Sequence, residues 1–368
     1  MKKLLYIAIA ALVALTACTK VDMEEYNPDR KVTFQVASYA QQTKANSSIW
    51  SEFTSFTAKA FLHAEGYTNG APQDFFGTAG QLITPYTSTG AAATTGNVSY
   101  WGPSHDYYWP KGDSHINFIA WHDNRGVAPA TATETSLSWT NYTVQDSDNL
   151  VYADEAWHYN LNTTNNNLYA NDPVAEGVPM LFHHALAQVA FQAKIKSGLA
   201  SDGFTHTVTI TNFSLSGIHT TGSLSLTNSD PANDVTPVTG ATTRAWTGSW
   251  VPSAATTSFS DAGSHTLSTT ATPLVAMRAV LPQNVSDNAD MVLTLSYTIS
   301  TAYGDNSSIV ENVTITKRLI QLVPTITDWL MGHKITYTIE FDPTTDSIQF
   351  KPTLVSWDNT GGGGVTLE

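Results

Sequence analysis

The sequence predicts an all-β protein with two tandem β-sandwich domains. Short segments alternate apolar and polar residues along most of the chain, and one example is "KITYTIEF" at residues 334–341. Alternation with a period of two is the pattern of a strand with one buried face, and many such strands separated by turn residues favour sandwiches. Thr, Ser, Asn and Gly are abundant and long heptad patterns are absent, which is typical of extracellular β-proteins.

The first residues predict secretion and lipidation. Residues 1–17 have a basic start, Lys2 and Lys3, and then an apolar run shorter than the ~20 residues that span a bilayer. The run ends in "LTAC", which looks like a bacterial lipobox, so we expect cleavage between Ala17 and Cys18 and acylation of the Cys18 thiol. Cys18 is the only cysteine, so the chain has no internal disulfide framework. A signal peptide that happens to end near a cysteine is the alternative.

The predicted organisation follows the chain. Residues 18–30 are a polar, acidic tether. Residues 31–177 form the first sandwich domain and residues 178–357 the second, since a mature chain of this length is too long for one small core. Residues 358–368, which include a run of four glycines, form a flexible tail.

The clearest strands carry their core residues in one phase. Residues 31–38 place Val32, Phe34 and Val36 on one face. In residues 205–218 the apolar phase changes between Ile210 and Phe213, which predicts a bulge near Thr211 and Asn212.

The stretch "VPMLFHHALAQVAFQAKI" at residues 178–195 reads both as a helix and as a strand. We interpret residues 181–185 as a short lead-in and residues 186–196 as the first strand of the second domain. His183 and His184 are adjacent, so on a strand they point to opposite faces and cannot hold one ion. We therefore expect no metal site there, and we expect His184 to form a backbone or interdomain hydrogen bond.

Catalytic and cofactor motifs are missing from the sequence. It contains no P-loop, no Rossmann glycine pattern, no HExxH and no GxSxG. The "GDS" containing Ser114 lacks a matching Asp-x-x-His, because Asp328 and His333 are five positions apart. We expect no enzyme activity, no cofactor and no metal. The net charge of −14 without basic clusters also argues against nucleic-acid binding.

An aromatic cluster leaves one alternative open. Trp101 and Trp109, with the tyrosines between them, are candidate glycan contacts, although aromatic residues of a sandwich more often lie in its core. The alternative function is therefore a lipid-anchored surface protein that binds glycans and does not polymerise.

Separated motifs together resemble a known family, the fimbrillins of Bacteroidales, which are subunits of type V pili. After the lipobox they are "VTFQV", "YYWPKGDSHINFIAW", "LFHHALAQVAFQAKI", "AVLPQ", "WLMGHKITYTIEF" and "IQFKPTLVSW". Each motif is weak alone, but their order and spacing cover nearly the whole mature chain.

The resemblance implies two transthyretin-like β-sandwich domains, export to the outer membrane as a lipoprotein, and a structural role in adhesion and biofilm formation. It also implies that a protease removes the first strand and that a strand from a neighbouring subunit fills the groove. Partners would then be other fimbrial subunits, the outer membrane through the lipid anchor before cleavage, and a host or bacterial surface ligand.

These roles map onto the sequence as expectations. The leaving strand carries Val32, Phe34 and Val36, and the donor, residues 347–357, carries Ile348, Phe350 and Leu354. Relatives usually have Arg just after the first strand. Here that loop has Lys44, so we expect a cut between Lys44 and Ala45. A cut after Arg30 would leave the first strand in place. Without cleavage the chain would stay lipid-anchored, as an anchor or accessory subunit does.

Overall fold

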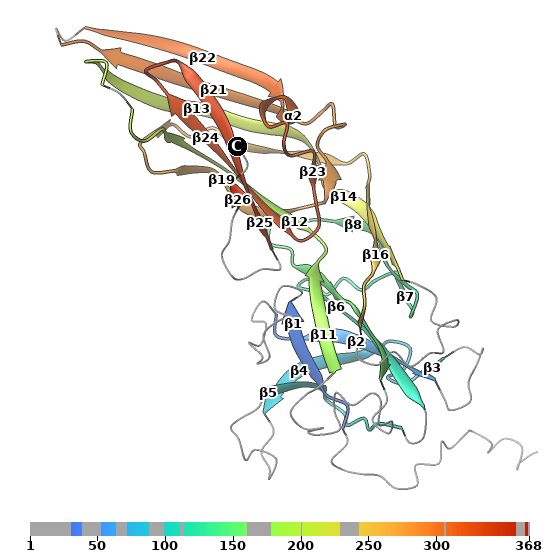
Figure 1. Cartoon of the computed structure of the whole chain (residues 1–368). Helices are drawn as coiled ribbons and strands as arrows, with labels where there is room; N and C mark the ends of the chain where they lie inside the picture. The colour runs from blue at the N-terminus through green and yellow to red at the C-terminus, as the bar shows by residue number, and fades with distance from the viewer. Residues whose placement is uncertain are drawn as a thin grey trace, which may run out of the picture.

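The prediction of an all-β protein is confirmed in the computed structural model (Figure 1). The structure describes residues 31–38, 53–63, 72–87, 99–110, 114–159, 178–199, 201–228, 243–304, 307–357 and 365–366. Strands dominate these residues, and the one helix among them is the short α2 (Leu319–Leu322). No helix of the described residues has the length and apolar character needed to cross a membrane.

The N-terminal part forms a ten-stranded sheet in the order β15-β10-β6-β9-β11-β1-β5-β4-β2-β3. Since β2 also pairs with β6, the path from β6 through β1 to β2 closes into a ring. The strands are β1 (Phe34–Ser38), β2 (Phe56–His63), β3 (Gln73–Asp74), β4 (Gln81–Thr87), β5 (Ser99–Pro103), β6 (His115–Asp123), β9 (Leu150–Ala153), β10 (Glu155–Tyr159), β11 (Val178–His184) and β15 (Thr243–Arg244).

Alternating side chains fill this ring. In β2 the inward positions Phe56, Ala58 and Ala60 are buried, and they pack in one cluster with Phe118 of β6. β6 is buried on both faces, because its other side chains, including Ile119, enter a second cluster between the two parts of the molecule. Strands buried on both faces read as continuous apolar runs, which explains the sequence "INFIAW".

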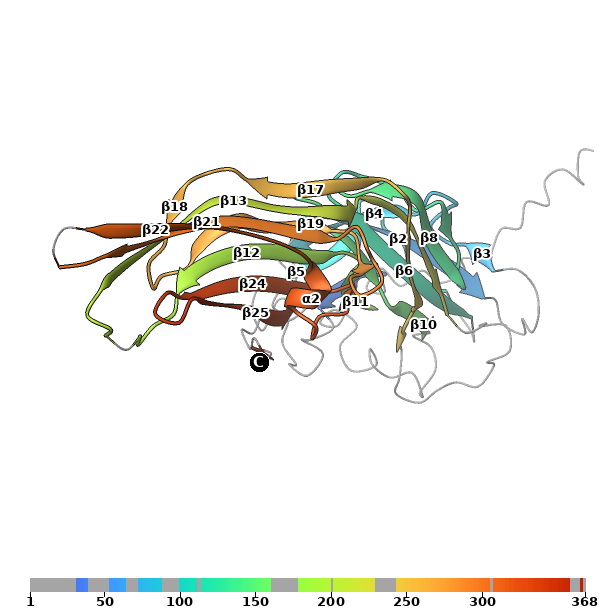
Figure 2. The same cartoon turned by 90° about the horizontal axis from the view of Figure 1, so that it is seen from above.

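The C-terminal part is a sandwich of two sheets (Figure 2). One sheet has the order β19-β12-β24-β25-β26 and the other β17-β13-β21-β22, with β18 also pairing with β13. The strands are β12 (Ala187–Ile195), β13 (Thr205–His219), β17 (Thr256–Asp261), β18 (His265–Thr266), β19 (Thr272–Val280), β21 (Val292–Ala302), β22 (Ser308–Arg318), β24 (His333–Asp342), β25 (Ser347–Ser356) and β26 (Val365–Thr366). A separate pair consists of β20 (Gln283–Asn284) and β23 (Asp328–Trp329).

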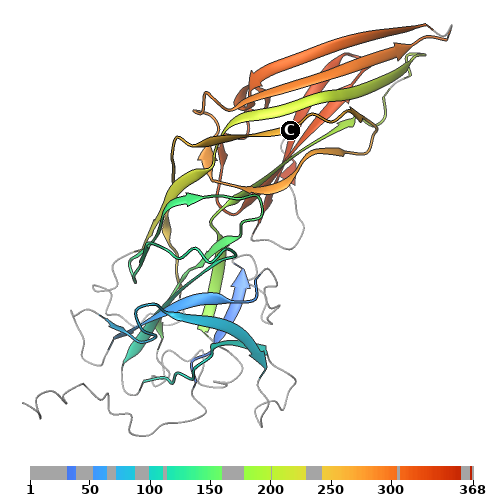
Figure 3. The same ribbon diagram turned by 180° about the vertical axis from the view of Figure 1, so that it is seen from behind.

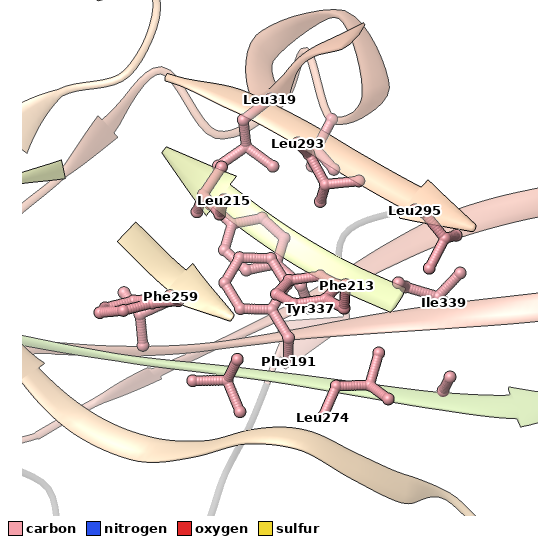
Figure 4. Close-up of a cluster of buried hydrophobic side chains, with 14 of the residues drawn as sticks. Phe191, Phe213, Leu215, Phe259, Leu274, Leu293, Leu295, Leu319, Tyr337 and Ile339 are labelled. Carbon is pink, nitrogen blue, oxygen red and sulfur yellow. The ribbon is translucent and has the colours of Figure 1, made fainter. Parts of the chain in front are cut away.

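The sandwich core is aromatic at its centre and aliphatic around it (Figure 4). Phe191 stacks on Tyr337 with ring centroids 4.8 Å apart and also contacts Phe213 of the facing sheet. Trp329 donates its indole N–H to the Tyr337 hydroxyl over 3.0 Å. The predicted bulge is confirmed, because the β13–β21 register shifts between Ile210 and Asn212, so that apolar residues on both sides of it are buried.

A four-stranded sheet in the order β16-β14-β8-β7 joins the two parts. Its strands are β7 (Thr131–Ala132), β8 (Ser136–Thr143), β14 (Thr221–Thr227) and β16 (Thr247–Pro252). β8 precedes the domain boundary predicted at residue 177, and its partner β14 follows it. The two halves of the chain therefore share a sheet, and the division into two tandem domains stays a prediction.

One local prediction is wrong. Residues 181–185 are not a lead-in, because residues 178–184 form β11, which pairs in parallel with β1 and antiparallel with β9. Of the segment predicted as a flexible tail, the structure describes residues 365–366, which form β26 and pair with Thr353 and Leu354 of β25. The prediction for the rest of that segment lies outside the described residues.

Candidate functional site

The first strand, β1, is one of the strands that form the ring, and it does not lie at a sheet edge. β1 pairs in parallel with β11 over five residues, from Phe34 opposite Val178 to Ser38 opposite Phe182, and Phe34 also pairs with Trp101 of β5 on its other side. Just before the strand, the Val32 N–H donates to the Tyr107 carbonyl over 2.8 Å. β1 therefore has neighbours on both sides.

The side chains expected to face the core do so. The exposed fractions of Val32, Phe34 and Val36 are 2%, 0% and 5%. The Phe34 ring makes edge-to-face contacts with Phe56 and Phe118, at centroid distances of 6.0 and 5.4 Å, and a third with Phe76 at 6.2 Å. At the start of the segment, Lys31 is partly exposed and forms an ion pair with Asp106.

The candidate donor strand β25 is paired on one side along its whole length. Ten residue pairs join it to β24, whereas on its other side β26 covers only Thr353 and Leu354. The three predicted donor residues, Ile348, Phe350 and Leu354, are half-buried against the sandwich core.

An ion-pair cluster also holds β25. Glu340 of β24 accepts a hydrogen bond from Lys351 over 2.6 Å and lies 3.2 Å from Lys194 of β12. The hydrogen bond from Lys351, together with Lys194, lowers the pKa of Glu340. The carboxylate thus links β25 and β12 to the strand between them.

The end of the donor segment reaches the junction between the two parts. Trp357 is buried and stacks on His184, with ring centroids 4.0 Å apart, while the Lys334 ammonium lies 5.3 Å from the Trp357 ring. Trp246 and Trp250 in the same cluster donate their indole N–H groups to the Ala153 and Ala185 carbonyls. Aromatic packing therefore connects β25 with the last residue of β11.

A profile of the fimbrillin-like family, Mfa_like_1, matches residues 71–357. This chain belongs to the fimbrillin-like family.

Three solved structures are similar to this fimbrillin-like chain. A fimbrial protein from Bacteroides vulgatus is 15% identical, with a TM-score of 0.42 over 89% of this chain and 99% of that one. A candidate cell adhesion protein from Bacteroides uniformis is 14% identical, with a TM-score of 0.40 over 90% of this chain and 100% of that one. The fimbrial anchor protein Mfa2 from Porphyromonas gingivalis is 10% identical, with a TM-score of 0.26 over 89% of this chain and 98% of that one. No curated protein matches.

Family membership establishes the coarse function. As a member of this family, the chain is a structural fimbrial protein of the cell surface, its partners are other fimbrial subunits, and it is not an enzyme. Ser114 is half-buried, while Asp328 accepts a hydrogen bond from Asn284 and His333 contacts the Met331 carbonyl. These local contacts give no sign that the three residues act together.

The two histidines at the junction have separate partners. His183 Nε2 lies 3.0 Å from an Asp154 carboxylate oxygen, and its ring stacks on Tyr152. His184 lies against Trp357, a contact that the sequence did not predict. In the described part of the chain, no group of three or more His, Cys, Asp or Glu side chains could hold a metal ion.

The glycan prediction is wrong for Trp101. Its exposed fraction is 2%, and its ring packs against Phe53 and Phe56, so neither face is open to a sugar. Trp109 is half-buried and contacts Phe118 edge-on. The two tryptophans thus belong to the packing of the ring and form no exposed stacking platform.

The sequence also missed a buried polar network at the junction. The Tyr142 hydroxyl lies 2.7 Å from an Asp123 oxygen and 3.0 Å from an Asp148 oxygen, and Arg125 forms an ion pair with Asp148. Burial raises the pKa of Tyr142 and of Asp148. Because these residues lie in β6, β8 and their loops, the network fastens the joining sheet to the ring.

Proposed function

We propose that this fimbrillin-like chain is exported as an outer-membrane lipoprotein and assembled into fimbriae by protease-triggered strand exchange, for adhesion and biofilm formation. The Cys18 thiol is acylated and the signal peptide is cut off between Ala17 and Cys18, and a second cut between Lys44 and Ala45 releases the lipidated segment with β1. Both cleavage positions lie outside the described residues.

The burial of β1 is the observation that carries this proposal. Val32, Phe34 and Val36 are almost completely buried, and the strand has a partner on each side. A fully buried apolar side chain contributes about 1.5 to 3 kcal/mol, so three give roughly 5 to 9 kcal/mol. Release of β1 would leave a groove whose unfilled apolar surface and two open strand edges favour capture of another strand.

The donor segment has the alternation that this groove needs. Ile348 and Phe350 are two residues apart, as are Val32, Phe34 and Val36. Pro352 follows in the same phase, and because proline has no N–H it weakens pairing on one side. Residues 347–351, which come before it, match the five residues of β1 in length. We therefore propose that residues 347–351 enter the groove of the neighbouring subunit and that Leu354 packs at its end.

The decisive experiment is the mature N-terminus of fibre material from the cell surface. Mass spectrometry should find Ala45 in assembled fibres of the native chain, and Lys44→Gln should block both the cut and assembly. Arg30→Gln is the matched control, because a cut there would leave β1 in place, and it should assemble normally. Lipidated Cys18 in assembled fibres, or normal assembly of the Lys44→Gln variant, would show that β1 does not leave. Anchored chains outside fibres would then mark an accessory subunit.

A further inference from the structure

β22 is an edge strand at the outer side of the C-terminal sandwich. It pairs with β21 over eleven residues and ends its sheet in the described structure. Figures 1 and 3 show it along the outer margin of the C-terminal half, at the opposite end from β1. Ile309 and Val310 are 61% and 56% exposed. A long edge strand presents a row of unpaired N–H and C=O groups, which is a template for pairing with another chain.

The two faces of β22 differ in character. Its register with β21 places Glu311, Val313, Ile315 and Lys317 opposite the core-facing residues of that strand. Val313 and Ile315 are only partly buried against the core, and Glu311 and Lys317 are exposed. Within this row Val313 and Ile315 thus lie between an acidic and a basic residue, and the exposed Ile309 continues the row beyond Glu311.

We propose that two copies of this chain pair through β22, antiparallel, with the two-fold axis at Thr314. In this register Glu311 of each copy lies opposite Lys317 of the other, and Val313 lies opposite Ile315. Directly opposed side chains of an antiparallel pair are about 4.5 to 5.5 Å apart at Cβ, close enough for both kinds of contact. The two-fold symmetry forms each contact twice.

Other registers lose this complementarity. A shift of two residues in one direction places Glu311 opposite Ile315, and a shift in the other direction places Val313 opposite Lys317. An odd shift would set core-facing residues against outward-facing ones, because side chains alternate between the faces of a strand. Glu311, Val313, Ile315 and Lys317 therefore favour this register over the neighbouring ones, and the occupant they fit is a second β22.

The contact is small and forms a weak dimer in isolation, since interfaces below about 1,200 Å² are typical of transient complexes. Pairing through β22 does not depend on how subunits join end to end in a fibre. Where many subunits lie in one fibre, repeated weak contacts between fibres would add through effective concentration.

A charge exchange tests the register. The measurement is the dimer dissociation constant by sedimentation equilibrium, with the Cys18→Ser chain as the parent. Glu311→Lys creates two like-charge pairs and should weaken dimerisation about tenfold, at roughly 0.7 kcal/mol for each pair. Adding Lys317→Glu to that variant should restore the dimer dissociation constant of the parent. A parent that remains monomeric, or a double variant as weak as the single one, would overturn the proposal.

Single cysteines locate the axis. Thr314→Cys in the Cys18→Ser chain should form an intermolecular disulfide on mild oxidation, because the two thiols meet at the axis. Asn312→Cys is the matched control on the same face of the strand. Its two copies would lie about 13 Å apart along the strands, too far for a disulfide. Equal cross-linking of both variants would contradict pairing at Thr314.

Discussion

Phe34→Ala should strongly destabilise the uncleaved chain. The ring is fully buried and makes three edge-to-face contacts, with Phe56, Phe76 and Phe118. A Phe→Ala change in a core of this kind costs about 3 to 5 kcal/mol, from lost transfer free energy and the cavity that remains. At roughly 2 to 4 °C per kcal/mol, the unfolding temperature should fall by roughly 6 to 20 °C.

Thermal unfolding followed by near-ultraviolet circular dichroism measures this fall. Leu82→Ala is the matched control, since Leu82 lies in the same sheet but is 59% exposed, and it should change stability by no more than about 0.5 kcal/mol. An equal effect of both variants would refute the view that β1 is held by its buried side chains. Cleavage after Lys44 would remove residue 34 from the native chain and from the Phe34→Ala variant alike. The two cleaved proteins should therefore have the same unfolding temperature.

Two further changes test the junction, with thermal unfolding as the measurement. Trp357→Ala removes a buried ring that stacks on His184, so it should lower the free energy of unfolding by about 3 to 5 kcal/mol. Val251→Ala is the control, because Val251 is 69% exposed. Similar losses of stability in the two variants would count against the stack. Burial raises the pKa of Glu155 to about 8, whereas the ordinary value is 4.5, so the folded chain retains a proton that the unfolded chain has lost between these pH values. Stability from Glu155 is therefore complete below about pH 4.5 and decreases as the pH rises to about 8. Glu155→Gln should remove this decrease, and an unchanged pH profile would mean that Glu155 does not titrate there.

The sequence predicted local features of this fold better than its pairings. Alternation located β1 and β24, and the phase change at Thr211 located a bulge, because both signals lie within a few residues; β25 was expected from the family resemblance. The parallel pairing of β1 with β11 left no such signal, since the two strands are far apart in the chain. The same holds for β8 and β14, which join the two halves.

The candidate site shows a similar division. The burial of Val32, Phe34 and Val36 follows from their spacing alone, and the structure agrees. The side to which Trp101 points could not be read from the sequence, because an aromatic residue suits either face of a strand. The stack of His184 on Trp357 could not be read from the sequence either, because it joins two segments from opposite ends of the C-terminal half.

The pairing of β1 with β11 also has a consequence for the order of folding. β11 begins at Val178, far beyond β1 in the chain, so the ring closes only when these two distant segments meet. Contacts between such distant segments form slowly, because a large loop must close first. β1 would then be among the last strands to dock, and a segment that docks late is well placed to be the one that is later exchanged.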